Sequence, residues 1–264
     1  MFIDTNGKAD LIKNQGITDK NKHPPISGIF KIKSYSTSFN MLSINSDDSS
    51  IVDRYWNDDF VDRSLDKWIE WTQIPGTYID VGAHTGLFTL AALANNNENF
   101  LISFEPYALN FYRMISNIRL NQFPPSRFSL FNKPVSDQNK NIKFEVESPF
   151  SYLSKGGKIG NEGIEMQTVK LDDLQFNNQK QLIKGIKIDT EGEDLNVLIG
   201  ASNLLKLHHP KMIVETRPSN IKDIVNFILS CGYEKIYDKK KLNFKDDAFY
   251  IFSNNKISKD IFIE

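Results

Sequence analysis

Glycine and polar residues follow a short apolar segment in the first third of the chain, in a pattern typical of a ligand-binding loop. The apolar segment 78–81 leads into small and polar residues and then into a helix-like stretch. Glycines at this place let the backbone turn sharply and approach a ligand, and the first N–H groups of the next helix attract an anionic group. The sequence therefore predicts a ligand-binding loop formed by Asp80, Val81, Gly82, Ala83, His84, Thr85 and Gly86.

The residues in and after this loop indicate which ligand it holds. A dinucleotide-binding loop has the pattern G-x-G-x-x-G, which needs a glycine at position 84, where this chain has His84. Glu105 follows Gly86 by 19 residues, close to the offset of about 20 expected for an acid that binds ribose hydroxyls. Because a carboxylate can accept from both hydroxyls, we expect a ribose-containing ligand other than a dinucleotide.

Polar residues after the third expected strand would lie on the same edge of a parallel sheet. The carboxyl ends of neighbouring parallel strands meet at one ligand-binding edge, and Ser136 and Asp137 follow such a strand. We predict that they reach an adenine ring, although Asp137 is equally typical of a simple turn.

Carboxylates after the fourth and fifth strands are the candidates for catalysis. The segment 187–192 reads Lys-Ile-Asp-Thr-Glu-Gly, and Glu215 ends the next strand. A carboxylate at the mouth of the site can accept a proton from a reacting group, and Asp189 is preferred over Glu191 and Glu215. Acidic residues here also suit the positive end of the following helix. The three side chains would be enough oxygen ligands for a divalent cation, but we do not expect a metal.

The elements that position these residues follow a regular pattern from Thr77 onward. Short apolar strands alternate with amphipathic helices, which is typical of parallel βαβ units. A further antiparallel β-hairpin, 142–146 with 166–169, interrupts the alternation and is a candidate substrate-facing insertion. The expected strands are 78–81, 100–104, 128–135, 185–189 and 212–215, closed by an antiparallel pair at 235–237 and 248–252, and the expected helices are 87–94, 108–121, 193–207 and 221–231.

The first 74 residues form an N-terminal extension in this interpretation, and residues 75–264 form the main domain. Residues 1 to about 35 are polar, are broken by glycine and proline, and show no periodicity, so we expect a loosely attached arm. A strand is expected near 41–44, and apolar residues at helical spacing from Phe60 to Ile69 predict a helix that packs beside the sheet.

Composition excludes several classes of partner. Lys and Arg number 32 against 33 Asp and Glu, without a basic block, so the footprint of a nucleic-acid binder is missing. Apolar runs are far shorter than the roughly 20 residues that cross a bilayer. The polar first ten residues do not resemble a signal peptide, and we expect a cytoplasmic protein.

Together these segments resemble the FkbM family of methyltransferases over residues 75 to about 218. The Lys-Ile-Asp-x-Glu-Gly segment, in register behind the glycine loop, is the most specific part of the resemblance. His84 departs from the family, which more often has asparagine there, so side-chain contacts at this position can differ while the backbone turn is kept. The matching stretches, in the family's order and approximate spacing, are 78–86, Phe104-Glu105-Pro106 with Asn110 and Asn117, Val135-Ser136-Asp137, 171–174, 187–192 and 197–201.

The resemblance implies a Rossmann-like, seven-stranded, mostly parallel sheet of the class I methyltransferase type. It implies the cofactor S-adenosyl-L-methionine, direct displacement, and methylation of a hydroxyl on a sugar, glycan or other secondary metabolite. It also adds Pro106 and Asn110 to the expected cofactor-binding residues. Two alternatives stay open: an NAD(P)-dependent oxidoreductase with the same fold and ribose acid, and a non-catalytic cofactor-binding module.

Overall fold

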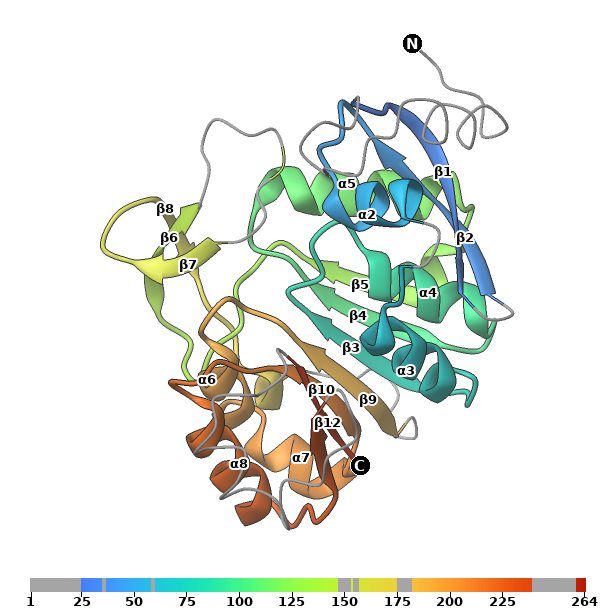
Figure 1. The fold of residues 1–264 in the computed structure, drawn as a ribbon. Coiled ribbons are helices and arrows are strands. Elements are labelled where there is room, and N and C mark those ends of the chain that lie inside the picture. Colours follow the sequence, from blue (N-terminus) through green and yellow to red (C-terminus); the bar gives the residue numbers. More distant parts are fainter. Residues whose placement is uncertain are drawn as a thin grey trace.

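A seven-stranded sheet with helices on both faces forms the centre of the computed structural model (Figure 1). The structure describes residues 25–34, 37–57, 60–146, 153, 157–174, 182–238 and 260–264. The sheet has the order β11-β12-β10-β9-β3-β4-β5, and β12 runs antiparallel to both its neighbours while the other pairs are parallel. The predicted mostly parallel α/β sheet is thus confirmed. The strands are β3 (Thr77–Val81), β4 (Phe100–Phe104), β5 (Phe128–Phe131), β9 (Ile183–Ile188), β10 (Lys211–Glu215), β11 (Ile236–Asp238) and β12 (Asp260–Ile263).

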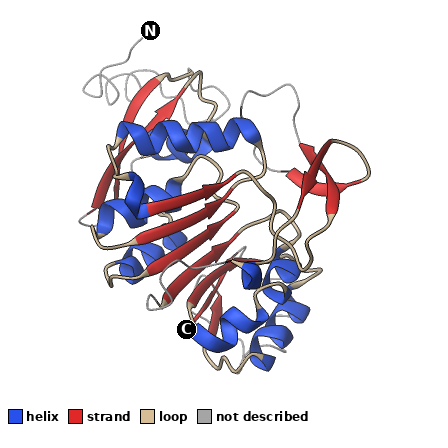
Figure 2. Ribbon diagram, turned by 180° about the vertical axis from the view of Figure 1, so that it is seen from behind, coloured by secondary structure: helices blue, strands red, loops and turns tan. Residues whose placement is uncertain are grey.

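Two layers of helices cover the sheet because successive side chains of each strand point to opposite faces. Tyr78 and Ile213 pack with the first layer, whereas Ile79 and Val214 pack with the second. All parallel strands end at one edge of the sheet, which Figure 2 shows from behind. The first layer contains α3 (Arg63–Thr72), α4 (Leu87–Asn95) and α5 (Ala108–Leu120), and the second contains α6 (Asp194–Ile199), α7 (Ser202–His208) and α8 (Ile221–Ser230).

The N-terminal segment is more ordered than the sequence indicated. Residues 28–34, expected to belong to an arm, form strand β1 (Gly28–Ser34), which pairs antiparallel with β2 (Thr37–Ser43). Residues 1–24 lie outside the described part of the chain. A short helix, α2 (Ser49–Trp56), follows the hairpin, and Asn117 of α5 accepts a 2.8 Å hydrogen bond from the N–H of Leu42. The hairpin is therefore fastened to the main domain.

Two of the expected elements differ markedly in extent, and a third lies outside the described residues. The strand expected over 128–135 ends at Phe131, because the proline at 134 cannot donate to a ladder. The helix expected over 193–207 is broken into α6 and α7 at Gly200, where a Cβ would lie 2.3 Å from the carbonyl oxygen of Ser136. The strand expected at 248–252 falls outside the described residues. Within them, β11 pairs antiparallel with β12 at 260–263.

The insertion between β5 and β9 is a small antiparallel sheet of its own. Strand β6 (Asn141–Val146) pairs with β8 (Ile164–Gln167), as expected, and also with a third strand, β7 (Gly157–Gly160). Short 3-10 turns occupy Pro125–Arg127 and Leu171–Asp173. Within the described residues, every helix is too short or too polar to cross a membrane.

Candidate functional site

The glycine loop between β3 and α4 adopts a conformation that requires its glycines. Gly82 has φ +75° and Gly86 has φ +94°, both in the left-handed region. The N–H groups of Gly82 and Ala83 both donate to the carbonyl oxygen of Phe104 at 2.9 Å, which fixes the loop to β4. A Cβ on Gly82 would lie 1.8 Å from the carbonyl oxygen of Asp189, so the loop also packs directly against the end of β9.

Glu105 connects this loop to the end of β4. Its carboxylate is 5% exposed and accepts 2.8 Å and 2.9 Å hydrogen bonds from the N–H groups of His84 and Tyr107. Burial raises the pKa of Glu105, while His84 and these N–H donors pull the pKa down. A carboxylate has about four lone-pair sites, so two bonds leave capacity for the hydroxyls of a ligand.

A buried lysine joins the loop to the fourth parallel strand. The Nζ of Lys187 donates to the carbonyl oxygen of Gly82 at 2.8 Å, and it lies 3.7 Å from Asp80 and 3.6 Å from Asp189. Burial alone would lower the pKa of Lys187, but the Asp189 and Asp80 carboxylates outweigh it and the pKa is raised. For Asp80 burial has the larger effect: it raises the pKa of this carboxyl, although the positive charge of Lys187 lowers it in part.

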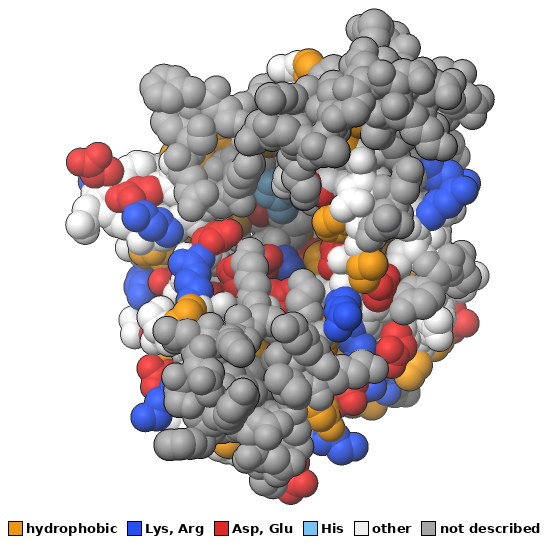
Figure 3. Space-filling view, in the orientation of Figure 1, with side chains coloured by type: hydrophobic (Ala, Val, Ile, Leu, Met, Phe, Trp, Pro, Cys, Tyr) orange, Lys and Arg blue, Asp and Glu red, His pale blue; other side chains and the backbone are white. Residues whose placement is uncertain are grey.

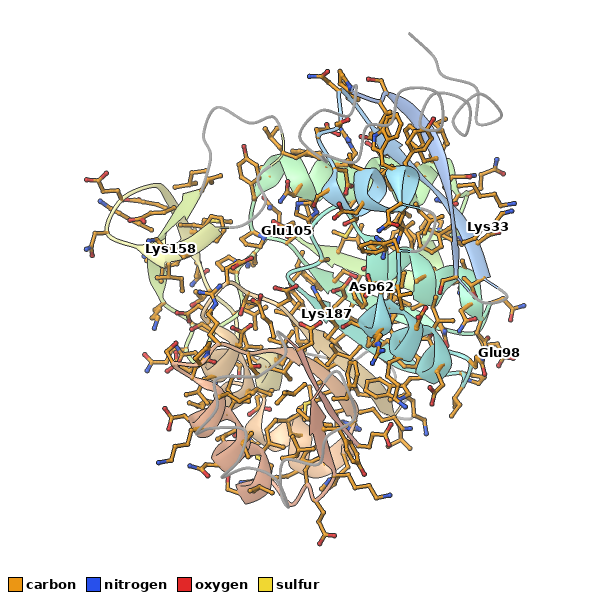
Figure 4. The ribbon with its side chains drawn as sticks, viewed as in Figure 1. Lys33, Asp62, Glu98, Glu105, Lys158 and Lys187 are labelled. Carbon is orange, nitrogen blue, oxygen red and sulfur yellow. The ribbon has the colours of Figure 1, made fainter. Side chains whose placement is uncertain are left out.

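A cavity of about 310 Å³ opens at this edge of the sheet, between the loop and the ends of β4 and β9. That volume falls in the range of small-molecule sites. In Figure 3, acidic side chains gather around a hollow in the middle of the face shown. In Figure 4, Glu105 and Lys187 lie at this edge, whereas Lys33 and Glu98 lie well away from it. The predicted site residues that line the cavity are Gly82, Ala83, His84, Thr85, Glu105, Pro106, Asn110, Asp189 and Glu191.

The other predicted residues lie close to the cavity without lining it. Asp80 is completely buried beneath the loop, where its carboxylate accepts a 2.7 Å hydrogen bond from the Thr89 hydroxyl. Ser136 is buried and donates to Glu193 at 2.9 Å. Lys133, Pro134 and Val135 line the wall where Ser136 and Asp137 were expected, because β5 ends four residues earlier than predicted. Gly86 and Glu215 are also absent from the lining.

The carboxylates of Asp189, Glu191 and Glu215 come together as the sequence suggested. One oxygen of each lies within 4.8 Å of the others, a group that could hold a cation. Arg217 contacts Glu191 and lies 3.9 Å from Glu215, so a guanidinium already supplies positive charge here. Asp189 instead pairs with Lys187 and faces the cavity.

The N-terminal helix adds residues to the cavity that the sequence did not predict, and the insertion, which was expected to face a substrate, also lines it. Ser49 and Ser50 of α2, and Phe144 and Lys158 of the small sheet, line its walls. Helix α2 is fixed to the glycine loop by Asp48, which accepts from the N–H of Ser50 at 2.9 Å and from the Thr85 hydroxyl at 2.6 Å. The Asp-Ser-Ser run is an N-cap signal that could have revealed this helix.

Comparison with known proteins gives one family. A family model described as the methyltransferase FkbM domain matches residues 80–235, which is more than half of the chain. A search of curated proteins found no match to the sequence.

The chain is also similar to solved structures of methyltransferases. The methyltransferase FkbM of Methylobacillus flagellatus is 17% identical with a TM-score of 0.50, and the match covers 72% of this chain but only 44% of that protein. Precorrin-6y C5,15-methyltransferase of Geobacter metallireducens is 12% identical with a TM-score of 0.42, over 78% of this chain and 93% of that one. TYW2 of M. jannaschii, solved in complex with AdoMet, is 9% identical with a TM-score of 0.42, over 90% and 84% of the chains.

Proposed function

The chain belongs to the FkbM methyltransferase family, and from that premise we propose that it transfers the methyl group of S-adenosylmethionine to a hydroxyl of a sugar, glycan or other secondary metabolite. The M. flagellatus protein is more than twice as long as the part matched here. The proposal for this chain therefore depends on its own residues.

Glu105 is the observation that carries the cofactor assignment. Its buried carboxylate lies at the wall of the cavity beside the glycine loop, and two backbone N–H groups hold it in place. Such a carboxylate can accept from both ribose hydroxyls, and the neighbouring loop backbone suits the methionine part of the cofactor. His84 occupies the position where a dinucleotide loop needs glycine, which favours S-adenosylmethionine over NAD(P).

Asp189 is the side chain best placed to receive the proton of the acceptor. It lies at the end of β9 and lines the cavity, and its ion pair with Lys187 at 3.6 Å fixes the carboxylate. Glu191 is engaged by Arg217, and Glu215 is 1% exposed and does not line the cavity.

Direct displacement needs little from the protein beyond position and a proton acceptor. Bound S-adenosylmethionine would supply an activated methyl group, whose bond to sulfur breaks as the bond to the acceptor oxygen forms. The loop and Glu105 would hold the cofactor, and Asp189 would take the hydroxyl proton. The walls of the cavity would exclude water.

Transfer of labelled methyl groups tests this function. Wild-type protein should label hydroxylated acceptors, and Asp189→Asn should lose most of its turnover, by roughly 100-fold or more, while its affinity for S-adenosylmethionine stays the same. Full turnover in Asp189→Asn would exclude this residue as the proton acceptor. Cofactor binding by the wild type without transfer to any acceptor would instead favour a non-catalytic module.

A further inference from the structure

A second cavity, of about 250 Å³, adjoins the first one at the same edge of the sheet. The two cavities share six lining residues: Ser49, Ser50, Leu87, Phe88, Lys187 and Asp189. The proposed proton acceptor Asp189 therefore faces both spaces. A molecule bound in the second cavity would therefore lie beside Asp189, which also lines the cofactor cavity.

The N-terminal segment builds much of this second cavity. Asp53 and Arg54 of α2, and Phe60 and Asp62 in the connection to α3, line it from one side. These residues precede the part of the chain that matches the family model, which begins at residue 80. This part of the wall of the second cavity therefore comes from residues outside the matched range, whereas Lys187 and Asp189, which both cavities share, lie within it.

Hydrogen bonds fix this wall relative to the cofactor loop. Asp48 links the start of α2 to Thr85 in the loop, and both side chains are completely buried. At the other end of the connection, Asp62 pairs with Arg54 at 2.5 Å and caps α3 through the N–H of Leu65 at 3.0 Å. A wall fixed in this way can orient a molecule relative to the cofactor.

The charge of the second cavity limits what it can bind. Its described lining residues include four aspartates, Asp53, Asp62, Asp189 and Asp260, against the two cations Arg54 and Lys187. Both cations are already paired with carboxylates. The excess of negative charge repels phosphate and carboxylate groups, whereas carboxylates and serine hydroxyls bind uncharged hydroxyls well. Figure 4 labels two of these lining residues, Asp62 and Lys187, which lie near one another.

We propose that the second cavity is the acceptor site and that it selects an uncharged, hydroxyl-rich ring such as a sugar without phosphate or carboxylate groups. This inference rests on the proposed function, because it assumes that the first cavity holds the cofactor. Phe60 supplies an apolar surface for the ring, and the carboxylates accept its hydroxyls. The hydroxyl nearest Asp189 would be the one methylated.

Matched acceptors test the selectivity. The full-length protein is incubated with labelled S-adenosylmethionine and either methyl glycosides of glucose, mannose and galactose or the corresponding sugar 1-phosphates. We expect methylation of the glycosides, with kcat/KM at least roughly tenfold above that for the phosphates. Cofactor binding accompanied by preference for the phosphates, or by no transfer to any glycoside, would overturn the inference.

Variants of residues that line the second cavity test whether the acceptor binds there. Asp53→Lys should raise KM for the glycosides at least about tenfold and reduce the discrimination against phosphates. Phe60→Ala should raise KM without changing that discrimination. Glu98→Lys is the matched charge reversal, at an exposed position away from both cavities, and should change neither.

Cofactor affinity separates this inference from the proposed function. All three variants should bind S-adenosylmethionine as the wild type does, which also shows that they fold. Unchanged KM values in both Asp53→Lys and Phe60→Ala would place the acceptor elsewhere. If the wild type itself does not bind S-adenosylmethionine, the proposed function is refuted rather than this inference.

Discussion

Substitution of Gly82 by alanine is the sharpest test of how the loop is built. The Gly82 φ of +75° lies in the left-handed region, which costs an L-residue about 1–2 kcal/mol. The new Cβ would also lie 1.8 Å from the backbone carbonyl oxygen of Asp189, whereas ordinary contact begins at 3.4 Å. Because the backbone fixes the position of the Cβ, and the oxygen that it meets is itself a backbone atom, neither can rotate away, and the loop must move away from β9.

The expected cost follows from these two contributions. Overpacking of this kind costs about 1–3 kcal/mol, so with the backbone strain Gly82→Ala should lose about 2–5 kcal/mol of unfolding free energy. For a domain of this size, each kcal/mol corresponds to about 2–4 °C in Tm. A loss near 3 kcal/mol would thus lower Tm by about 6–12 °C. Displacement of the loop should also weaken S-adenosylmethionine binding by roughly tenfold or more.

Gly232→Ala is the matched control, measured by thermal unfolding and calorimetric titration beside Gly82→Ala. Gly232 has a similar φ of +91°, but a Cβ there would meet only the His209 ring, at 3.5 Å. It should therefore lose only the backbone part, about 1–2 kcal/mol, and keep cofactor affinity. If both variants show equal Tm and equal affinity, the close packing of the loop on Asp189 has no energetic consequence and the reasoning fails.

Three further variants test the connections around the loop. Glu105→Gln should weaken S-adenosylmethionine binding about 10- to 100-fold. Because burial raises the pKa of Glu105, the affinity of the wild type should begin to fall on acidification at a pH above the ordinary pKa of a glutamate. Calorimetry over the same pH range should show no such fall in the variant. Lys187→Met leaves the buried carboxylate of Asp80 without its cation and should cost about 3–5 kcal/mol in urea unfolding; an unchanged midpoint would contradict the role of this ion pair. Thr85→Val removes the hydrogen bond to Asp48 and should cost about 1–3 kcal/mol, whereas unchanged stability would show that the link between α2 and the loop is weak.

The sequence was most informative where one physical requirement dominates. The strand over Phe100–Phe104 was predicted at its observed bounds, because it is an apolar run between turn residues. The loop was recognisable by its glycines, because Gly82 and Gly86 combine a positive φ with close contacts that leave no room for a Cβ. The approach of Asp189, Glu191 and Glu215 followed from parallel strands that end at one edge.

Tertiary contacts decided what the sequence could not. Helix α2 has only eight residues, and its buried face, with Ile51, Tyr55 and Trp56, is too short to show periodicity. The assignment of Ser136 to the cofactor was made from a strand longer than the one observed, and the hydrogen bond from its hydroxyl to Glu193 is visible only in the fold. Lys187 was visible within a motif, but only the fold shows that it joins Asp80, Gly82 and Asp189.

Calorimetric titration of the wild type and of Glu105→Gln, first with S-adenosylmethionine and then separately with NAD, shows whether Glu105 holds the ribose of S-adenosylmethionine. The wild type should bind S-adenosylmethionine at one site and should not bind NAD, and Glu105→Gln should bind S-adenosylmethionine much more weakly. Preferential binding of NAD, or undiminished affinity for S-adenosylmethionine in the variant, would contradict this expectation.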